Sequence, residues 1–314
     1  MKKFLFVAQF LLFIAFNFFL YLTIVEVTNS RSAFQRLDHE PAVYNGKEEF
    51  DPSLSRLNSV DRVEEYCDSI FNYNKEHSPN KNFSFENEYP LIVSEVIRRR
   101  FFHGYCSYGY SDNHMALLLE PLISDKWISA IVIPDDILNY PNAACSQQSI
   151  VTMELLKRKG YNTRMVGFDG GQKFGGHFCF EAFYNNSWHF FDTDQEPDAN
   201  VLAAYDRPSI EFLVKNENIL TAAYNQWDKE RLLGMFRNYF YGKVNKFEAP
   251  NALIYQRVTK FLSYTLWVFL LAAFLVVRRR YLRLITPYNV RNSRISIPSI
   301  AGKGSVSYYS KNRA

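Results

Sequence analysis

The stretch AACSQQSIVTMELLKRKG, residues 143–160, places a cysteine directly before a helix-forming run. Apolar residues then recur at helical spacing, and they are Ile150, Met153, Leu155 and Leu156. Gly160 follows as a typical C-terminal cap. The pattern therefore predicts an amphipathic helix that begins at Cys145 and ends at Gly160.

Three strands are predicted immediately after this helix. Their sequences are TRMVGF, HFCFEAFY and SWHFFDTD, beginning at Thr163, His177 and Ser187. The glycine-rich link DGGQKFGG separates the first two strands, and Asn185-Asn186 separates the last two. Because a two-residue Asn-Asn turn reverses the chain, we expect Asp192 to return beside His177.

This order of elements favours a nucleophilic cysteine. A helix N-terminus presents unpaired backbone N–H groups and positive dipole character, which favour the thiolate of Cys145. An imidazole at His177 can accept and deliver the proton, and a carboxylate at Asp192 can hold the other ring nitrogen. A structural cysteine with a core histidine is the alternative for any single pair of these residues.

These residues resemble the core of the transglutaminase-like superfamily, over about residues 141–197. Its members carry a cysteine that opens a helix, a strand histidine in a motif like H-A-W-x-E-V, and an aspartate in W-x-x-x-D-P-T. The resemblance implies a papain-like α+β fold, in which the nucleophile helix packs on an antiparallel sheet. It implies Cys145 as nucleophile, His177 as base and Asp192 as orienting acid, with Glu181 and Trp188 as framework residues.

The chain departs from the family pattern at several positions. Ala143 and Ala144 replace a glycine before the nucleophile, Cys179 replaces a tryptophan, and Thr193-Asp194 replaces Pro-Thr. None of these changes removes a catalytic side chain. A catalytically inactive scaffold or binding module, serving an envelope assembly or polymer-export machine, is the alternative function.

Two apolar runs lie outside this core. Phe4–Val25 follows Lys2 and Lys3, and Phe261–Val277 precedes an arginine cluster that begins at Arg278. Each run has about the length that spans a bilayer. A cleaved signal peptide is the alternative for the first run, and a buried soluble helix is the alternative for the second.

The flanking cations predict the orientation. Lysines before the first run and arginines after the second should stay cytoplasmic, so the central domain should be extracytoplasmic, either periplasmic or at the cell surface. The predicted organisation is an anchor at 1–27, a transglutaminase-like domain at 28–257, a transmembrane helix at 258–284 and a basic disordered cytoplasmic tail at 285–314. Within the domain, helices are predicted at 61–74, 91–102, 114–122, 209–224 and 230–244.

Several residues near the core leave choices open. Cys67 and Cys106 form either a disulfide or two reduced core thiols. Gln147 and Gln148 are oxyanion helpers or solvent-facing residues. His103 and His114 are expected to be ordinary polar or structural residues, with metal binding as the alternative, and His189 is expected to be a surface residue.

The sequence as a whole indicates a membrane-anchored, thiol-dependent acyl-transfer enzyme. Its expected substrates are peptides, proteins or acyl groups, and its expected partners are the lipid bilayer and other envelope proteins. The reaction calls for no cofactor and no metal. A net charge of +4 over 314 residues does not indicate a nucleic-acid partner.

Overall fold

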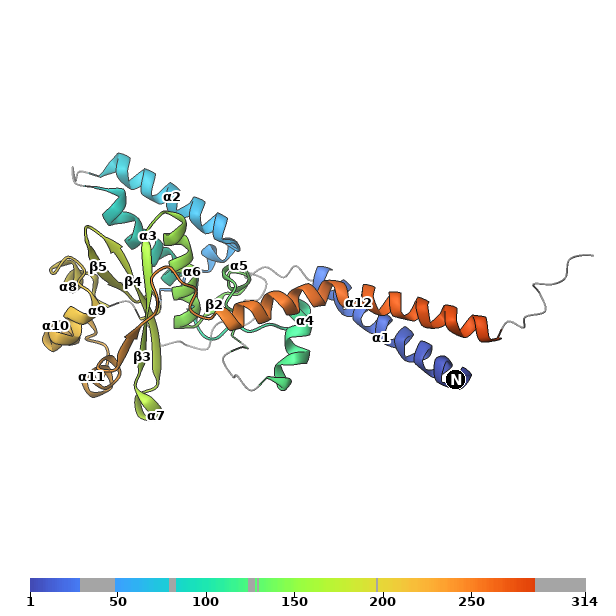
Figure 1. The fold of residues 1–314 in the computed structure, drawn as a ribbon. Helices are drawn as coiled ribbons and strands as arrows, with labels where there is room; N and C mark the ends of the chain where they lie inside the picture. Colours follow the sequence, from blue (N-terminus) through green and yellow to red (C-terminus); the bar gives the residue numbers. More distant parts are fainter. Residues whose placement is uncertain (29–48, 79–82, 124–127, 129, 196, 286–314) are drawn as a thin grey trace, which may run out of the picture. The chain divides into compact units, whose positions relative to one another are not determined.

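The computed structural model describes residues 1–28, 49–78, 83–123, 128, 130–195 and 197–285 (Figure 1). Contacts divide the chain into two units, one made of residues 1–18 with the chain from Trp267 onward and one made of residues 19–266. The candidate site lies entirely in the second unit. The predicted basic tail, residues 285–314, lies outside the described residues except for Ile285.

The second unit is built around a four-stranded antiparallel sheet with the order β5-β4-β3-β6. The strands are β3 (Asn162–Asp169), β4 (Gly176–Tyr184), β5 (Ser187–Phe191) and β6 (Tyr239–Tyr241). Asn185 and Asn186 have φ angles of 46° and 59°, as a two-residue type I′ hairpin turn requires. The predicted hairpin is therefore confirmed, whereas β6 lies in a segment that was predicted to be helical.

Helices cover both faces of this sheet (Figure 1). On one face, α6 (Cys145–Arg158) packs against β4 and β3, and α2 (Val60–His77) and α3 (Phe85–Arg100) pack beside it. The core of this face includes Phe180 and Ala182 of β4. Cys179, the residue before Phe180, belongs to a second core on the opposite face, so the predicted alternation along the strand is confirmed.

Four short helices contribute to the second core. They are α8 (Ala199–Ala203), α9 (Ile210–Lys215), α10 (Glu217–Ala223) and α11 (Lys229–Phe236). Phe168 of β3 stacks on Phe236 of α11, with ring centroids 4.4 Å apart. This packing holds the segment after β5 against the sheet, which places Asp192 close to β4.

The remaining elements of the second unit precede α6 in the chain, except for α7, which lies between β3 and β4. They are η2 (Pro52–Arg56), β1 (Phe102–His103), α4 (Tyr110–Leu119), η3 (Glu120–Leu122), α5 (Pro134–Ile137), β2 (Asn142–Ala143) and α7 (Gly171–Phe174). The pair β1-β2 is parallel, with His103 opposite Ala143. Because β2 leads directly into α6, this pairing brings His103 next to the start of the cysteine helix.

All four cysteines are free thiols. Cys67 lies on α2 in the first core, and Cys106 follows β1 in the same core. Both are almost fully buried. Of the two alternatives for this pair, the structure contains two reduced core thiols.

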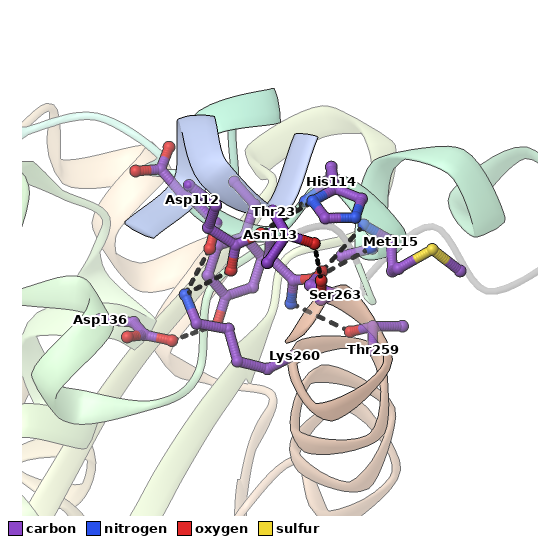
Figure 2. Close-up of polar contacts among 12 residues, drawn as sticks. Thr23, Asp112, Asn113, His114, Met115, Asp136, Thr259, Lys260 and Ser263 are labelled. Carbon is purple, nitrogen blue, oxygen red and sulfur yellow. Dashed lines mark hydrogen bonds and ion pairs between the residues drawn. The ribbon is translucent and has the colours of Figure 1, made fainter. Parts of the chain in front are cut away.

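Within the described part of the chain, two helices are long and apolar enough to cross a membrane: α1 (Lys2–Thr28) and α12 (Pro250–Ile285). Within the second unit, the end of α1 and the beginning of α12 meet α4 in a buried polar junction (Figure 2). The Thr23 hydroxyl donates to the Ser263 carbonyl oxygen at 2.6 Å, and Asn113 bonds to the side chains of both Thr259 and Ser263. These contacts tie the two helices to the domain.

A carboxylate lies at the centre of this junction. Glu26, with its side chain 1% exposed, bonds through Oε2 to His114 Nδ1 at 2.9 Å, and its Oε1 lies 3.3 Å from Lys260 Nζ. Lys260 also donates to the carbonyl oxygen of Asp112, a residue that Figure 2 shows beside it. His114 is therefore a buried structural residue, in agreement with the sequence-based expectation.

Candidate active site

Cys145 is the first residue of α6, as its sequence position predicts. Ala144, in extended conformation, is the N-cap and offers no side-chain cap to the first-turn N–H groups. Those groups are therefore free of a capping side chain next to a partly buried thiol. Positive dipole character at this end of the helix favours a negative charge on the sulfur.

The imidazole of His177 and the carboxylate of Asp192 come from the β4-β5 hairpin and the residue that follows it. His177 is the second residue of β4, and Asp192 directly follows β5. His177 Nε2 and Asp192 Oδ2 lie 2.7 Å apart, and the Asp192 side chain is fully buried. Because the type I′ turn fixes the register of the two strands, this pair forms at their shared end.

Further donors hold the Asp192 carboxylate. The Tyr224 hydroxyl donates to Oδ2 at 2.9 Å, and the backbone N–H groups of Asp194 and Gln195 donate to Oδ1 at 3.2 and 3.0 Å. Hydrogen bonds to the charged form favour an ionised carboxylate. Burial would raise the pKa of Asp192, but His177 and these donors lower it below its usual value.

The same contact favours the charged form of the histidine. Burial alone would lower the pKa of His177, but the Asp192 carboxylate outweighs burial and raises this pKa well above its ordinary value. The interaction with Cys145 contributes in the same direction. The pair therefore favours an imidazolium that can stabilise a neighbouring thiolate.

The sulfur lies within reach of this ring. The Cys145 sulfur, a ring nitrogen of His177 and an oxygen of Asp194 all lie within 4.8 Å of one another. The structure thus brings together Cys145, His177 and Asp192, which are 47 residues apart at most in the printed sequence.

Two overlapping sets of side chains have the composition of metal sites. They are Cys145, His177 and Asp194, and His177, Cys179 and Asp192, and each set has its candidate ligand atoms within 4.8 Å of one another. Thiolate, imidazole and carboxylate are the ligands that Zn²⁺ takes in proteins. In the second set, however, burial raises the pKa of Cys179 well above its usual value, which disfavours the thiolate a metal needs.

The two glutamines of the first turn are buried, so the expectation that they face solvent is wrong. The Gln147 amide bonds to backbone groups of Cys106, Ala144 and Ile131, which anchor the start of α6. Gln148 Nε2 donates to Ala143 O and to Asp194 Oδ1. The Gln147 amide and the Gln148 amide nitrogen are thus used inside the protein, whereas the buried Oε1 of Gln148 has no hydrogen-bond partner among the described residues.

Three other residues contribute to the framework. The Glu181 side chain is fully buried. Its Oε2 lies 2.6 Å from Arg164 Nη2, and its Oε1 accepts a hydrogen bond from the Ile210 backbone N–H. The Arg164 guanidinium lies 4.2 Å from the ring centroid of Trp188. The structure therefore gives both expected framework residues contacts between strands.

Sequence reasoning missed several neighbours of the site. His103 Nδ1 lies at hydrogen-bond distance, 2.6 Å, from Asp194 Oδ1. Tyr224, at the C-terminal end of α10, donates a hydrogen bond to Asp192 Oδ2. His189 is buried and stacks on Tyr184 at 3.7 Å, so its expected surface position is wrong. The departure at Asp194 was visible in the motif, but nothing local to His103 or Tyr224 indicated where their side chains would lie.

Comparison with protein-family models, with curated proteins and with solved structures found no match for this chain. The chemistry of the site must therefore be inferred from its geometry. That geometry contains a thiol at a helix N-terminus, an imidazole within 4.8 Å of it and a buried carboxylate behind the imidazole.

Proposed function

We propose that the protein is a membrane-anchored, thiol-dependent acyl-transfer enzyme with a transglutaminase-like core. The observation that carries this proposal is the position of the His177 ring, which has a nitrogen within 4.8 Å of the Cys145 sulfur and its Nε2 2.7 Å from the Asp192 carboxylate. Nucleophile, base and orienting acid in this order form the arrangement used in thiol acyl transfer.

The proposed reaction uses these residues in two steps. The Cys145 thiolate attacks the carbonyl of an amide or ester, while backbone N–H groups at the start of α6 stabilise the oxyanion. His177 then donates its proton to the leaving group, and Asp192 holds the ring in position. Water or an amine takes the acyl group from the thioester, which makes the enzyme a peptidase or amidase in the first case and a transferase in the second.

The membrane setting belongs to the same proposal. α1 and α12 would both cross the bilayer, with Lys2, Lys3 and the arginines from Arg278 onward in the cytoplasm. The domain of residues 28–257 would then face the periplasm or the cell surface. Peptides, proteins or acyl groups of the envelope would be its substrates.

The test is the reactivity of the thiol. The full chain in detergent micelles is treated with iodoacetamide over a range of pH, and labelled cysteines are mapped by mass spectrometry. We expect Cys145 to label faster than a free thiol at mildly acidic pH. In His177→Ala, we expect the labelling rate of Cys145 to fall by roughly 100-fold, so that this advantage is lost. His77→Ala is the matched control, because His77 lies exposed on α2.

Equal labelling of wild type and His177→Ala at the rate of a free thiol would contradict the proposal. That result would favour a scaffold or binding module that keeps the fold without turnover. A second experiment identifies the substrate class: the acyl-thioester on Cys145 is trapped from a cell-envelope extract, and its acyl group is identified by mass.

A further inference from the structure

The thiol site contains a carboxylate that the proposed triad does not use. One oxygen of Asp194, the Cys145 sulfur and a ring nitrogen of His177 all lie within 4.8 Å of one another. The motif that the sequence resembles has a threonine in place of Asp194, so this carboxylate is a feature of the present chain. Thiol, imidazole and carboxylate thus meet from the start of α6, the start of β4 and the segment after β5.

The three donor atoms are of the kinds that zinc takes. Thiolate, imidazole and carboxylate are the usual protein ligands of Zn²⁺, whereas Mg²⁺ and Ca²⁺ take oxygen ligands. In a tetrahedral site with metal–ligand bonds of about 2.0–2.3 Å, neighbouring ligand atoms lie about 3.3–3.6 Å apart. Because the three atoms already lie within 4.8 Å of one another, side-chain rotations that bring them closer by about 1.5 Å at most complete this geometry.

The charges of the set also fit a divalent ion. A thiolate at Cys145 and the carboxylate of Asp194 together balance the two positive charges of Zn²⁺. The Asp194 side chain is only 2% exposed, so a neutral complex avoids leaving a net charge in a site that is largely withdrawn from water. Cys145 is partly exposed, so solvent reaches this side of the site and a water molecule can be the fourth ligand.

The imidazole has the outer contact that is typical of zinc-bound histidines. His177 Nε2 lies 2.7 Å from Asp192 Oδ2, and the Tyr224 hydroxyl holds the same carboxylate oxygen. A zinc ion bound at Nδ1 leaves this contact intact, which gives the carboxylate–histidine–zinc order that fixes ring orientation in many zinc sites.

The Asp194 carboxylate is oriented by hydrogen bonds of its own. Its Oδ1 lies 2.6 Å from His103 Nδ1 and accepts from Gln148 Nε2 at 3.1 Å, and its Oδ2 accepts from Gln195 Nε2 at 3.0 Å. A carboxylate offers about four acceptor positions, so these contacts leave room for a metal ion. Both the imidazole and the carboxylate are therefore held in place before an ion arrives.

We propose that Cys145, His177 and Asp194 form a zinc site, and that bound Zn²⁺ reversibly blocks the thiol. The thiolate is both the nucleophile and the metal ligand, so a sulfur that is bound to zinc cannot attack a carbonyl. Zinc binding goes beyond the proposed function, because it requires the three side chains and no turnover. Only the block of acyl transfer rests on that function.

The first experiment measures zinc binding directly. The full chain in detergent micelles is purified without a polyhistidine tag, stripped with EDTA, dialysed and titrated with Zn²⁺ in a calorimeter. We expect Asp194→Asn to weaken binding by roughly 100-fold and His103→Ala, which removes an outer contact of Asp194, to weaken it by roughly 10-fold. Glu65→Gln, at an exposed position of α2, is the matched control and should bind as tightly as the wild type.

A second measurement reports on the sulfur and does not depend on the folding of the Asp194 variant. Co²⁺ that binds a thiolate in a zinc site gives a sulfur-to-metal charge-transfer band in the near ultraviolet. We expect this band with the wild type and not with Cys145→Ser, in which an oxygen replaces the sulfur. The same band in both proteins would overturn coordination by Cys145.

Iodoacetamide labelling separates the zinc site from the proposed function. Saturating Zn²⁺ should slow labelling of Cys145 at least about 10-fold, and EDTA should restore the original rate. Labelling that Zn²⁺ leaves unchanged, or equal Zn²⁺ affinities of the wild type and Asp194→Asn, would overturn the zinc site and leave the thiol chemistry intact. Labelling of the metal-free wild type at the rate of a free thiol would contradict the proposed function, whereas the calorimetric result would still decide zinc binding.

Discussion

The pair formed by His177 and Asp192 is the residue-scale feature with the clearest energetic consequence. The two charges are buried together at 2.7 Å, and the Tyr224 hydroxyl completes the shell of Asp192. Removing one partner of such a pair leaves an uncompensated buried charge, which costs about 3–5 kcal/mol. The site therefore depends on both charges being present together.

This pair predicts a pH dependence of stability. The folded-state pKa of His177 is raised, so its contribution is complete below its unfolded value of 6.5 and is lost as the pH rises through the folded value. The folded-state pKa of Asp192 is lowered, so its contribution is present above 3.8 and is lost as the pH falls through the folded value. We expect the stabilisation by the pair to be greatest between these two unfolded values.

The measurement compares thermal unfolding of the wild type with that of His177→Asn/Asp192→Asn, which carries no charge at the pair. The difference in midpoint should be greatest between about pH 4 and 6.5 and should shrink above the raised pKa of His177. A difference that stays constant from mildly acidic to alkaline pH would contradict an ionised pair.

At the scale of elements, the β4-β5 hairpin sets the positions of His177 and Asp192. Its turn places both asparagines in the left-handed region, with φ angles of 46° and 59°. Asn185 has partners in Glu86 and Asn87 of α3, so its substitution changes more than the turn. Asn186 is the position that isolates the backbone requirement.

We predict that Asn186→Ala lowers the free energy of unfolding by about 1 kcal/mol, whereas Asn186→Gly leaves it nearly unchanged. The reason is that a left-handed conformation costs roughly 1–2 kcal/mol for a residue with a Cβ other than Asn or Asp, and nothing for glycine. Denaturant unfolding followed by tryptophan fluorescence measures both variants. Equal destabilisation by Ala and Gly would instead assign the effect to the lost asparagine side chain.

At the scale of the whole molecule, the polar junction joins the end of the first apolar helix, residues 19–28, to the domain. Glu26, close to the end of α1, is the carboxylate that both His114 and Lys260 contact. If α1 were removed by cleavage, the Lys260 ammonium and the buried His114 ring would lose this partner. Because these contacts would be lost, we predict that α1 is retained rather than cleaved as a signal peptide.

We predict that Glu26→Leu lowers stability by about 3 kcal/mol, because it leaves the Lys260 charge without its carboxylate. Glu26→Leu/Lys260→Met should recover part of this loss, since neither charge then remains. Thermal unfolding in detergent measures the variants, and Lys243→Met, at an exposed position, is the control. When the wild type carries a tag at each terminus, both tags should be detected in the same electrophoretic band. Loss of the N-terminal tag would contradict retention of α1.

Local patterns predicted much of the site. Helical periodicity located the helix that Cys145 opens, period-two alternation located β4, and Asn185-Asn186 located the turn that returns Asp192 to His177. Each of these signals acts over a few residues, so it can be interpreted from the chain alone. The strand β6 was not predicted, because its three residues lie within an apolar pattern of helical spacing and carry no separate strand signal.

The printed chain alone accounts for the two apolar helices, the cysteine helix and the hairpin, because hydrogen bonding and side-chain periodicity within each segment are local properties. The positions of His103, Asp194 and Tyr224 around the thiol, and of Glu26 beside Lys260, come only from the folded arrangement. Those residues are separated by tens to hundreds of positions, and their contacts exist only after the β1-β2 pairing, the helix layer over Asp192 and the polar junction have formed.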